Sequence, residues 1–492
     1  MKKELYSKIL KRINQVDRKV NRKMITRIVL GLKSKIVIMF TLLIFCSMLL
    51  PGCRQRELAK DTITEKNRIE DDITENNITE NNITNNNAEN NITEDNHAQE
   101  WTDADKSNYG EIDYSGKLPN LDALLSTCTY ITKEMYEKAT AFKEGDLTRI
   151  AAAMRKAKAG EKVTIGVIGG SITEGYSASQ KSNCYASLLK QWWVDTFPEA
   201  EIELINAGVG GTGSYLGVHR VDEDLLSHKP DFVVVEFAVN DGNSFFYKKS
   251  YDNLVRRILQ QENEPALALL FMTMEDGTSA QDLEANIGFQ YGLPMISYGN
   301  GVLQEMKNNN LAWKDISPDN IHPNDRGHGI VGELFTVYLT QIYHRLDTIP
   351  KEVTPFKMAA VTKEVYTKAE ILDSKEIKPA KWGSFYKDDV NTVFPNNWST
   401  ESGEEGIEFI VEAANIGIMY QKLTNGTGGQ YEVYVDGEYA MTLDADFSNG
   451  WGDFSETTEV FVSEDRKMRT IEIRKKGSST EENFTILGLL IS

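Results

Sequence analysis

Two kinds of hydrophobic pattern divide this sequence. Between residues 146 and 344, short apolar runs rich in Val, Ile and Leu alternate with amphipathic segments. Short apolar runs are typical of strands buried on both faces, and their alternation with helices predicts a parallel sheet between two helical layers. We expect strands at 163–168, 201–207, 231–238, 266–272 and 294–297, and helices at 146–158, 185–197, 220–226 and 327–344.

The pattern changes after Pro350. Residues 375–492 contain runs in which apolar and polar positions alternate, which is typical of strands with one buried face. Asp436-Gly437 is a hairpin turn signal between two such strands. The segment therefore predicts an antiparallel β-sandwich or jelly roll, with strands at 407–412, 430–435, 459–462, 469–474 and 484–491.

The N-terminal segment has the features of an export signal. A basic stretch precedes a 15-residue apolar run at 36–50, which is short for a membrane-spanning helix but typical of a signal-peptide core. Leu50-Pro51-Gly52-Cys53 resembles a bacterial lipobox, in which Cys53 would be lipidated. The alternative is an uncleaved signal anchor. Residues 54–100 are polar, acidic and repetitive, so we expect a disordered tether.

Charge and cysteine content exclude some functions. Residues 1–35 hold 12 Lys and Arg against 2 Asp and Glu, so the rest of the chain has a net charge of −29 within the total of −19. Such an acidic body does not favour nucleic-acid binding. The four cysteines and six histidines show no metal-ligand spacing. We expect Cys128 and Cys184 to be unpaired.

The chemistry of the chain centres on Ser171. Two glycines and this serine follow the strand at 163–168, so its hydroxyl should stand at the carboxyl end of a central strand, where open α/β sheets bind ligands. Ser171 is either a nucleophile or a helix N-cap, a position that serine favours. Three other loops, at Gly210-Gly211, Asn240-Asp241 and 319–322, can converge on the same sheet edge.

These loops resemble the SGNH (GDSL-type) hydrolase superfamily. Its four marker blocks occur in order at 169–175, 206–212, 235–241 and 319–322, and the usual Gly-Asp-Ser-Leu reads Gly-Gly-Ser-Ile here. The resemblance implies a flavodoxin-like α/β/α fold and an ester hydrolase without a cofactor. It also implies the site residues, with Ser171 as nucleophile, His322 as base, Asp319 as its partner, and the Ser171 and Gly211 N–H groups and the Asn240 amide as oxyanion donors.

The resulting expectation is a lipid-anchored esterase on the bacterial cell surface that deacetylates polysaccharide. Trp451, on a polar glycine-flanked loop, is a candidate for stacking on sugar, or it plugs one end of the sandwich. The alternatives are a lysophospholipase or other small-ester esterase, and a non-catalytic glycan-binding lipoprotein. We divide the chain into a signal peptide with lipobox (1–53), a tether (54–100), a catalytic domain (101–346), a connecting segment (347–374) and a β-sandwich that is a candidate carbohydrate-binding domain (375–492).

Overall fold

The computed structural model describes residues 121–401, 403–477 and 482–492. The expected signal peptide, Cys53 and the tether lie outside these residues. Within them, no helix is both long and apolar enough to cross a membrane. Cys128 and Cys184 are both free thiols, as expected.

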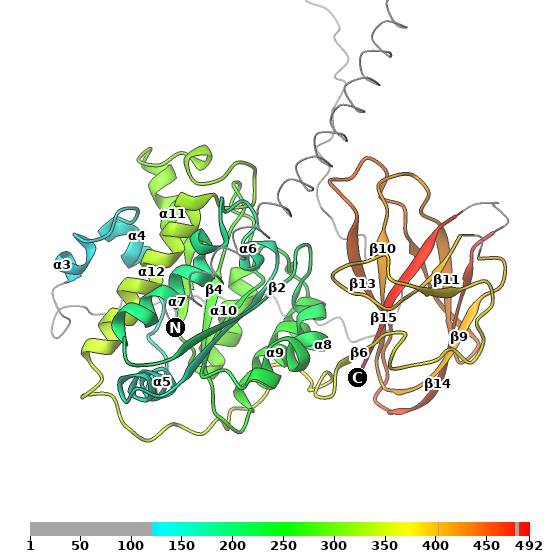
Figure 1. The fold of residues 1–492 in the computed structure, drawn as a ribbon, viewed down its shortest axis with the longest axis horizontal. Helices are drawn as coiled ribbons and strands as arrows, with labels where there is room; N and C mark the ends of the chain where they lie inside the picture. Colours follow the sequence, from blue (N-terminus) through cyan, green and yellow to red (C-terminus); the bar gives the residue numbers. More distant parts are fainter. Residues whose placement is uncertain (1–120, 402, 478–481) are drawn as a thin grey trace, which may run out of the picture. The chain divides into compact units, whose positions relative to one another are not determined.

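A five-stranded parallel sheet forms the first half of the described chain (Figure 1). Its strand order is β2-β1-β3-β4-β5, which is the flavodoxin-like order, so the expected fold class is confirmed. The central strand β1 is buried along its whole length, because β2 and β3 flank it and helices cover both faces. The strands are β1 (Val163–Gly169), β2 (Ile202–Gly208), β3 (Phe232–Glu236), β4 (Ala266–Phe271) and β5 (Met295–Ser297).

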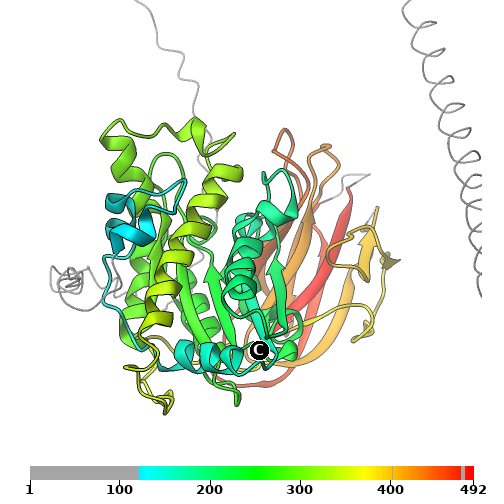
Figure 2. The same cartoon turned by 60° about the vertical axis from the view of Figure 1, so that its left-hand side comes forward.

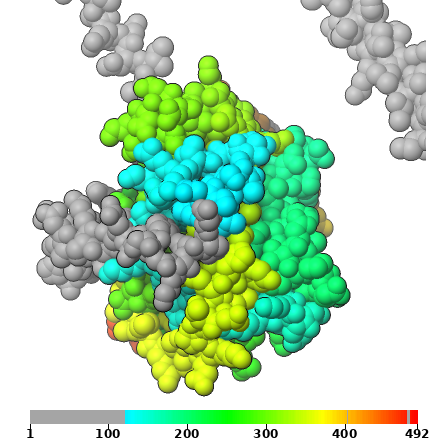
Figure 3. Space-filling view, turned by 90° about the vertical axis from the view of Figure 1, so that its left-hand side faces the viewer, coloured from blue at the N-terminus to red at the C-terminus, as the bar shows by residue number. Residues whose placement is uncertain are grey.

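Two hydrophobic cores cover the two faces of this sheet. The helices α4, α5, α7, α11 and α12 contribute to one core, and α8, α9 and α10 to the other. Figure 3 shows the cyan α4 segment beside α11, where Met135 of α4 packs close to Gly301. The helices are α3 (Leu121–Leu125), α4 (Lys133–Ala139), α5 (Thr148–Lys158), α6 (Ser171–Glu174), α7 (Tyr185–Thr196), α8 (Ser214–Asp224), α9 (Phe245–Leu259), α10 (Gln281–Tyr291), α11 (Tyr298–Lys307) and α12 (Asp325–His344).

Two of the helix predictions need correction. The helix expected at 220–226 begins earlier, at Ser214, and ends at Asp224. The helix expected from Asp146 begins at Thr148; Asp146 lies outside it and accepts a hydrogen bond from the Thr148 N–H. The structure adds α9, α10 and α11, which the periodicity did not predict.

The C-terminal strands form two antiparallel sheets (Figure 2). One has the order β13-β10-β15-β8-β7, with β6 also paired to β15, and the other has the order β12-β11-β14-β9. Asp436 and Gly437 both have positive φ and join β11 to β12, as the hairpin signal predicted. The strands are β6 (Glu370–Leu372), β7 (Tyr386–Asp388), β8 (Asn397–Thr400), β9 (Ile407–Ala413), β10 (Ile416–Lys422), β11 (Gln430–Val435), β12 (Glu438–Asp444), β13 (Phe454–Phe461), β14 (Lys467–Lys475) and β15 (Phe484–Ile491).

Candidate active site

Ser171 stands at the carboxyl end of the central strand. β1 ends at Gly169, Gly170 is the N-cap of α6, and Ser171 is the first residue of that helix. Ser171 is therefore not the helix cap, which was one of the two alternatives for it. Its Oγ lies 3.0 Å from the Nε2 of His322, within hydrogen-bond reach.

The loop at 317–322 holds His322 and Asp319 as a local pair. The Asp319 Oδ2 lies 2.9 Å from the His322 Nδ1, and the Asp319 Oδ1 accepts hydrogen bonds from the backbone N–H groups of Ile321 and His322. The Ser317 Oγ lies 2.6 Å from the carbonyl oxygens of both Asp319 and His322, so its one hydroxyl proton bonds to either of them and helps to fix the turn. Partial burial opposes the charged carboxylate, but these hydrogen bonds outweigh it and lower the pKa of Asp319. Asp319 is thus an anion that can orient the imidazole.

Asn240 lies directly against the nucleophile loop. A Cβ placed on Gly170 would be 2.2 Å from the Asn240 Oδ1, closer than real atoms approach. Glycine at position 170 therefore leaves room for the Asn240 side chain, which a larger residue there would displace. Within the described residues, the Asn240 Nδ2 has no hydrogen-bond partner, so it can donate to a ligand oxygen.

The second oxyanion candidate, Gly211, lies in a turn that demands glycine. Its φ is +71°, in the left-handed region. The preceding N–H, that of Gly210, donates to the Glu174 Oε2 at 2.9 Å. Among the residues that the structure describes, the Gly211 N–H itself has no partner. The N–H of Gly211, and not that of Gly210, can therefore donate to a substrate oxygen.

Trp451 of the β-sheet region lies against this turn. A Cβ on Gly211 would be 3.4 Å from the Trp451 ring. The ring stacks on Phe454 at a centroid distance of 5.0 Å and contacts the edge of Phe447, yet 66% of Trp451 remains exposed. The ring is therefore held in place while its outer face is open to solvent.

The three aspartates near Trp451 are already used within the loop. Asp453 accepts from the N–H and hydroxyl of Thr424, and Asp446 accepts from Ser448. Asp444 accepts from the Asp446 N–H and from Gln430. These carboxylates shape the loop and hold Trp451 and its neighbours in position.

Sequence reasoning missed Tyr176, on the other side of His322. The two ring centroids are 4.4 Å apart, and 58% of the tyrosine is exposed. Its N–H bonds to the Ser171 carbonyl, and its own carbonyl lies 3.3 Å from the Nε2 of His328. Burial lowers the pKa of His328 to about 4, so this histidine is a neutral packing group. A single tyrosine in a loop has no periodic pattern that would have revealed this contact.

A group of buried carboxyls lies beneath the site, at the end of β3. Burial raises the pKa of Glu236 to about 7, although the Thr173 hydroxyl and the Gly170 N–H bond to it. Burial also raises the pKa of Asp241 to about 7, despite its bonds to Ser214. Both groups touch the active-site loops from below, since Gly170 and Thr173 flank Ser171 and Ser214 begins α8.

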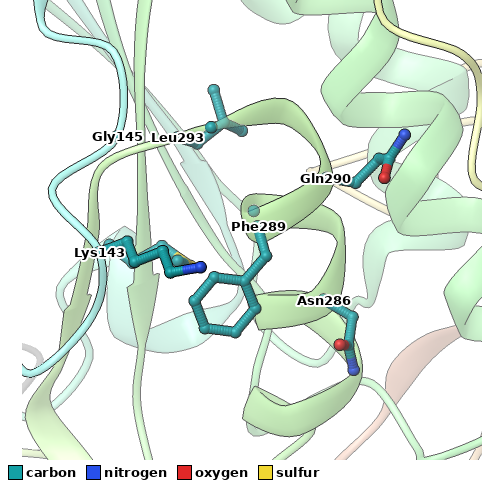
Figure 4. Close-up of a pocket in the computed structure, with 9 residues that line it drawn as sticks. Lys143, Gly145, Asn286, Phe289, Gln290 and Leu293 are labelled. Carbon is teal, nitrogen blue, oxygen red and sulfur yellow. The ribbon is translucent and has the colours of Figure 1, made fainter. Parts of the chain in front are cut away.

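A separate hollow lies at the opposite edge of the sheet. It has a volume of about 430 Å³ and is lined by Lys143, Phe289, Leu293 and their neighbours, at the start of β5 (Figure 4). Parallel strands place their ligand sites at the other, carboxyl edge, so this hollow is not part of the Ser171 site. No group of three or more His, Cys, Asp or Glu residues that could hold a metal occurs in the described part of the chain.

Comparison with known proteins agrees with this geometry. The model of the GDSL-like lipase/acylhydrolase family matches residues 167–330. A solved two-domain esterase, active on acetylated mannans and co-crystallised with mannopentaose, is 32% identical to this chain. The structural match covers 73% of this chain and 97% of the esterase chain, with a TM-score of 0.66. This chain belongs to the GDSL (SGNH) hydrolase family.

The likeness extends through both halves of the described chain. The matched esterase is covered almost completely, so its second domain is included along with its catalytic one. A second relative is thioesterase 1/protease 1/lysophospholipase L1 of Escherichia coli strain K12, 25% identical over 169 residues, which are 33% of this chain and 76% of that protein. The chain is accordingly an ester hydrolase of the SGNH type with a C-terminal all-β region.

Proposed function

We propose that this esterase removes acetyl groups from polysaccharide. The main support is the likeness over both domains to an esterase active on acetylated mannans. A β-sheet region that contributes an exposed tryptophan beside the candidate oxyanion turn suits a polymeric substrate, because an aromatic face can stack on a sugar ring. A small soluble ester would gain nothing from that ring.

In the proposed mechanism, Ser171 attacks the acetyl carbon. As its Oγ forms the new bond, the proton passes to the Nε2 of His322, 3.0 Å away. The Asp319 carboxylate fixes the tautomer of His322 and stabilises the imidazolium that forms. Collapse of the tetrahedral intermediate breaks the bond to the sugar oxygen, which takes the proton from His322. Water, deprotonated by His322, then releases acetate and restores Ser171.

The tetrahedral oxyanion is held by three donors in this proposal. They are the N–H groups of Ser171 and Gly211 and the side-chain amide of Asn240. Gly211 and Asn240 have donors without partners among the described residues, and both flank the nucleophile loop. Donors that are already in place cost no reorganisation when negative charge develops on the carbonyl oxygen.

Trp451 and Tyr176 are proposed to contact the sugar on either side of the reacting ester. Trp451 lies next to Gly211, and Tyr176 lies next to His322. Both rings are more than half exposed, which is unusual for large aromatic side chains in a folded protein. They would bind the polymer without touching the reacting carbonyl.

We further propose that the enzyme acts outside the cytoplasm and is anchored to the bacterial membrane through a lipidated Cys53. The lipobox-like Leu50-Pro51-Gly52-Cys53 after a basic and apolar segment supports this location. A polysaccharide substrate is consistent with it. Metabolic labelling with a fatty-acid analogue should mark the parent protein and leave the Cys53→Ser variant unlabelled.

The test of the proposed activity compares acyl chain length and polymer. The parent protein should hydrolyse 4-nitrophenyl acetate faster than the longer esters and should release acetate from acetylated mannan or xylan, while Ser171→Ala should lose several orders of magnitude in rate. Trp451→Ala should raise KM on the polymer and leave 4-nitrophenyl acetate turnover nearly unchanged. A preference for long-chain esters and lysophospholipid would instead favour the lipase alternative.

A further inference from the structure

We propose that Glu174 is a positioning residue that sets the geometry of the oxyanion turn at Gly210–Gly211. This inference rests on the proposed esterase mechanism and adds a residue to which no role has been given. Glu174 closes the short helix α6, three residues after Ser171. It therefore belongs to the same rigid segment as the nucleophile.

The geometry ties that segment to the turn after β2. The Glu174 Oε2 accepts the N–H of Gly210 at 2.9 Å, and the Thr173 carbonyl accepts the Asn206 Nδ2 at 2.8 Å. The backbone of α6 packs so closely here that a Cβ on Gly208 would be 2.2 Å from the Glu174 nitrogen. Two hydrogen bonds therefore fix the turn to the nucleophile helix α6: that of the Glu174 side chain with Gly210 and that of the Thr173 carbonyl with Asn206.

This bond has a direct consequence for the donors of the oxyanion hole. By accepting the Gly210 N–H, Glu174 fixes the orientation of that peptide, and the next amide, on Gly211, is left for the substrate. The turn lies close to the nucleophile, since a Cβ on Gly210 would be 3.7 Å from the Ser171 Cβ. The Ser171 and Gly211 N–H groups come from two different loops, so their separation depends on a link of this kind.

The effect should appear in the rate more than in stability. Glu174 is exposed, and a hydrogen bond from an exposed carboxylate to a backbone amide contributes little to folding because water competes for both groups. An oxyanion donor, in contrast, must lie within a few tenths of an ångström of its place in the transition state. A small displacement of the Gly211 N–H therefore lowers kcat while the fold persists.

The experiment measures kcat and KM for 4-nitrophenyl acetate in five variants of the full chain. Glu174→Ala removes the acceptor, and we expect a loss in kcat of roughly 10- to 100-fold, below the 10²–10³ typical for an oxyanion donor itself. Glu174→Gln keeps an acceptor oxygen at the same reach and should retain most of the activity. Glu376→Ala, which removes an exposed glutamate bond of the same 2.9 Å length to a backbone N–H, that of Asp373, is the matched control and should not change kcat.

The remaining two variants are Asn240→Ala alone and Asn240→Ala combined with Glu174→Ala. If Glu174 acts through the oxyanion hole, the double variant should lose less than the product of the two single losses, because both changes damage the same stabilisation. Unchanged kcat in Glu174→Ala, equal losses in the Ala and Gln variants, or strictly multiplicative losses would each overturn the proposal. Failure of the esterase mechanism itself would show separately, as retained activity in Ser171→Ala.

Discussion

Gly170 allows two loops of this site, those that hold Ser171 and Asn240, to lie close together. The family position before the nucleophile usually holds aspartate, but here Asn240 occupies the space that its Cβ would need. Glycine permits the amide of Asn240 to lie against the loop that holds Ser171. The residue type at 170 and the placement of the proposed oxyanion donor are therefore coupled.

Gly170→Ala should lower kcat on 4-nitrophenyl acetate by roughly the 10²–10³ expected for a displaced oxyanion donor. The physical reason is the 2.2 Å approach of the new Cβ to the Asn240 Oδ1, which forces the amide away. Steady-state kinetics on the single variant and on Gly170→Ala combined with Asn240→Ala measure this. In the Asn240→Ala background the glycine substitution should cost little more, and a full additional loss there would show that Asn240 is not the cause.

At the scale of the element, β1, β3 and β4 were predicted because they are apolar runs buried along their whole length, and the edge strand β2, which contains Glu203 and Asn206, is only half-buried. Helix α9 was not predicted, although apolar residues recur along it at helical spacing, at Tyr251, Leu254, Val255 and Ile258. The polar residues between them, such as Asp252, Asn253 and Arg257, are buried as well. These polar groups are bonded inside the molecule, for example Asn253 to the carbonyls of Lys249 and Lys363. Tertiary hydrogen bonds of this kind leave no trace in the pattern of apolar positions, so the burial of the polar residues of α9 could not be predicted from the sequence.

The same distinction applies to the site. Ser171, Asp319 and His322 follow from short motifs, because each lies in a loop with a recognisable sequence, and the structure brings them together. The neighbours of these residues depend on tertiary contact. Trp451 meets Gly211, and Tyr176 meets His322, only because the chain folds back on itself. Neither of these two contacts can be predicted from the local periodicity of the sequence.

The carboxyl end of β3 should give the protein an unusual dependence of stability on pH. An unfolded Glu has a pKa of about 4.3, whereas burial raises that of Glu236 to about 7. Between these values the unfolded chain releases the proton and the folded one keeps it, so the free energy of unfolding falls as pH rises through this window. Above the folded-state pKa of Glu236, this residue no longer lowers the free energy of unfolding as pH rises. Thermal unfolding between pH 5 and pH 8 measures it.

Glu236→Gln cannot ionise and should flatten this decline in Tm. Glu464→Gln is the control, because Glu464 is exposed and pairs only at the surface with Lys363, so the slope should stay as in the parent. Asp241, whose pKa burial also raises to about 7, should retain part of the slope in the Gln variant. A parent Tm that rises steadily from pH 5 to pH 8 would contradict the raised pKa of Glu236.

At the scale of the whole described chain, the catalytic sheet and the β-sheet region share a packed boundary. Tyr215 of α8 and Leu487 and Leu490 of β15 belong to one hydrophobic core. At its edge the Lys249 Nζ of α9 lies 2.9 Å from the Glu459 Oε2 of β13, with side chains only 9% and 12% exposed. Glu459 also accepts the hydroxyl of Tyr366. β13, which carries Glu459, begins at Phe454, the residue on which Trp451 stacks.

Lys249→Met should therefore reduce both stability and polymer binding. It leaves the Glu459 carboxylate buried without its cation, which typically costs about 3–5 kcal/mol. Combining it with Glu459→Gln should recover much of that loss, because no buried charge then remains unpaired. Lys363→Met is the matched control: its pair with Glu464 joins the connecting segment to the loop after β13 and is 78% and 85% exposed, so we expect a loss of less than about 1 kcal/mol.

The kinetics of the Lys249→Met variant distinguish an effect on polymer binding from an effect on ester hydrolysis. If β13 moves, Trp451 loses its place beside Gly211 while Ser171, His322 and Asp319 keep theirs, because those three belong to the catalytic sheet and its loops. Lys249→Met should then raise KM on acetylated mannan with kcat on 4-nitrophenyl acetate retained, measured at a temperature where the variant is folded. Equal effects on the two substrates, or a denaturation midpoint indistinguishable from that of Lys363→Met, would mean that the buried pair does not hold the tryptophan at the site.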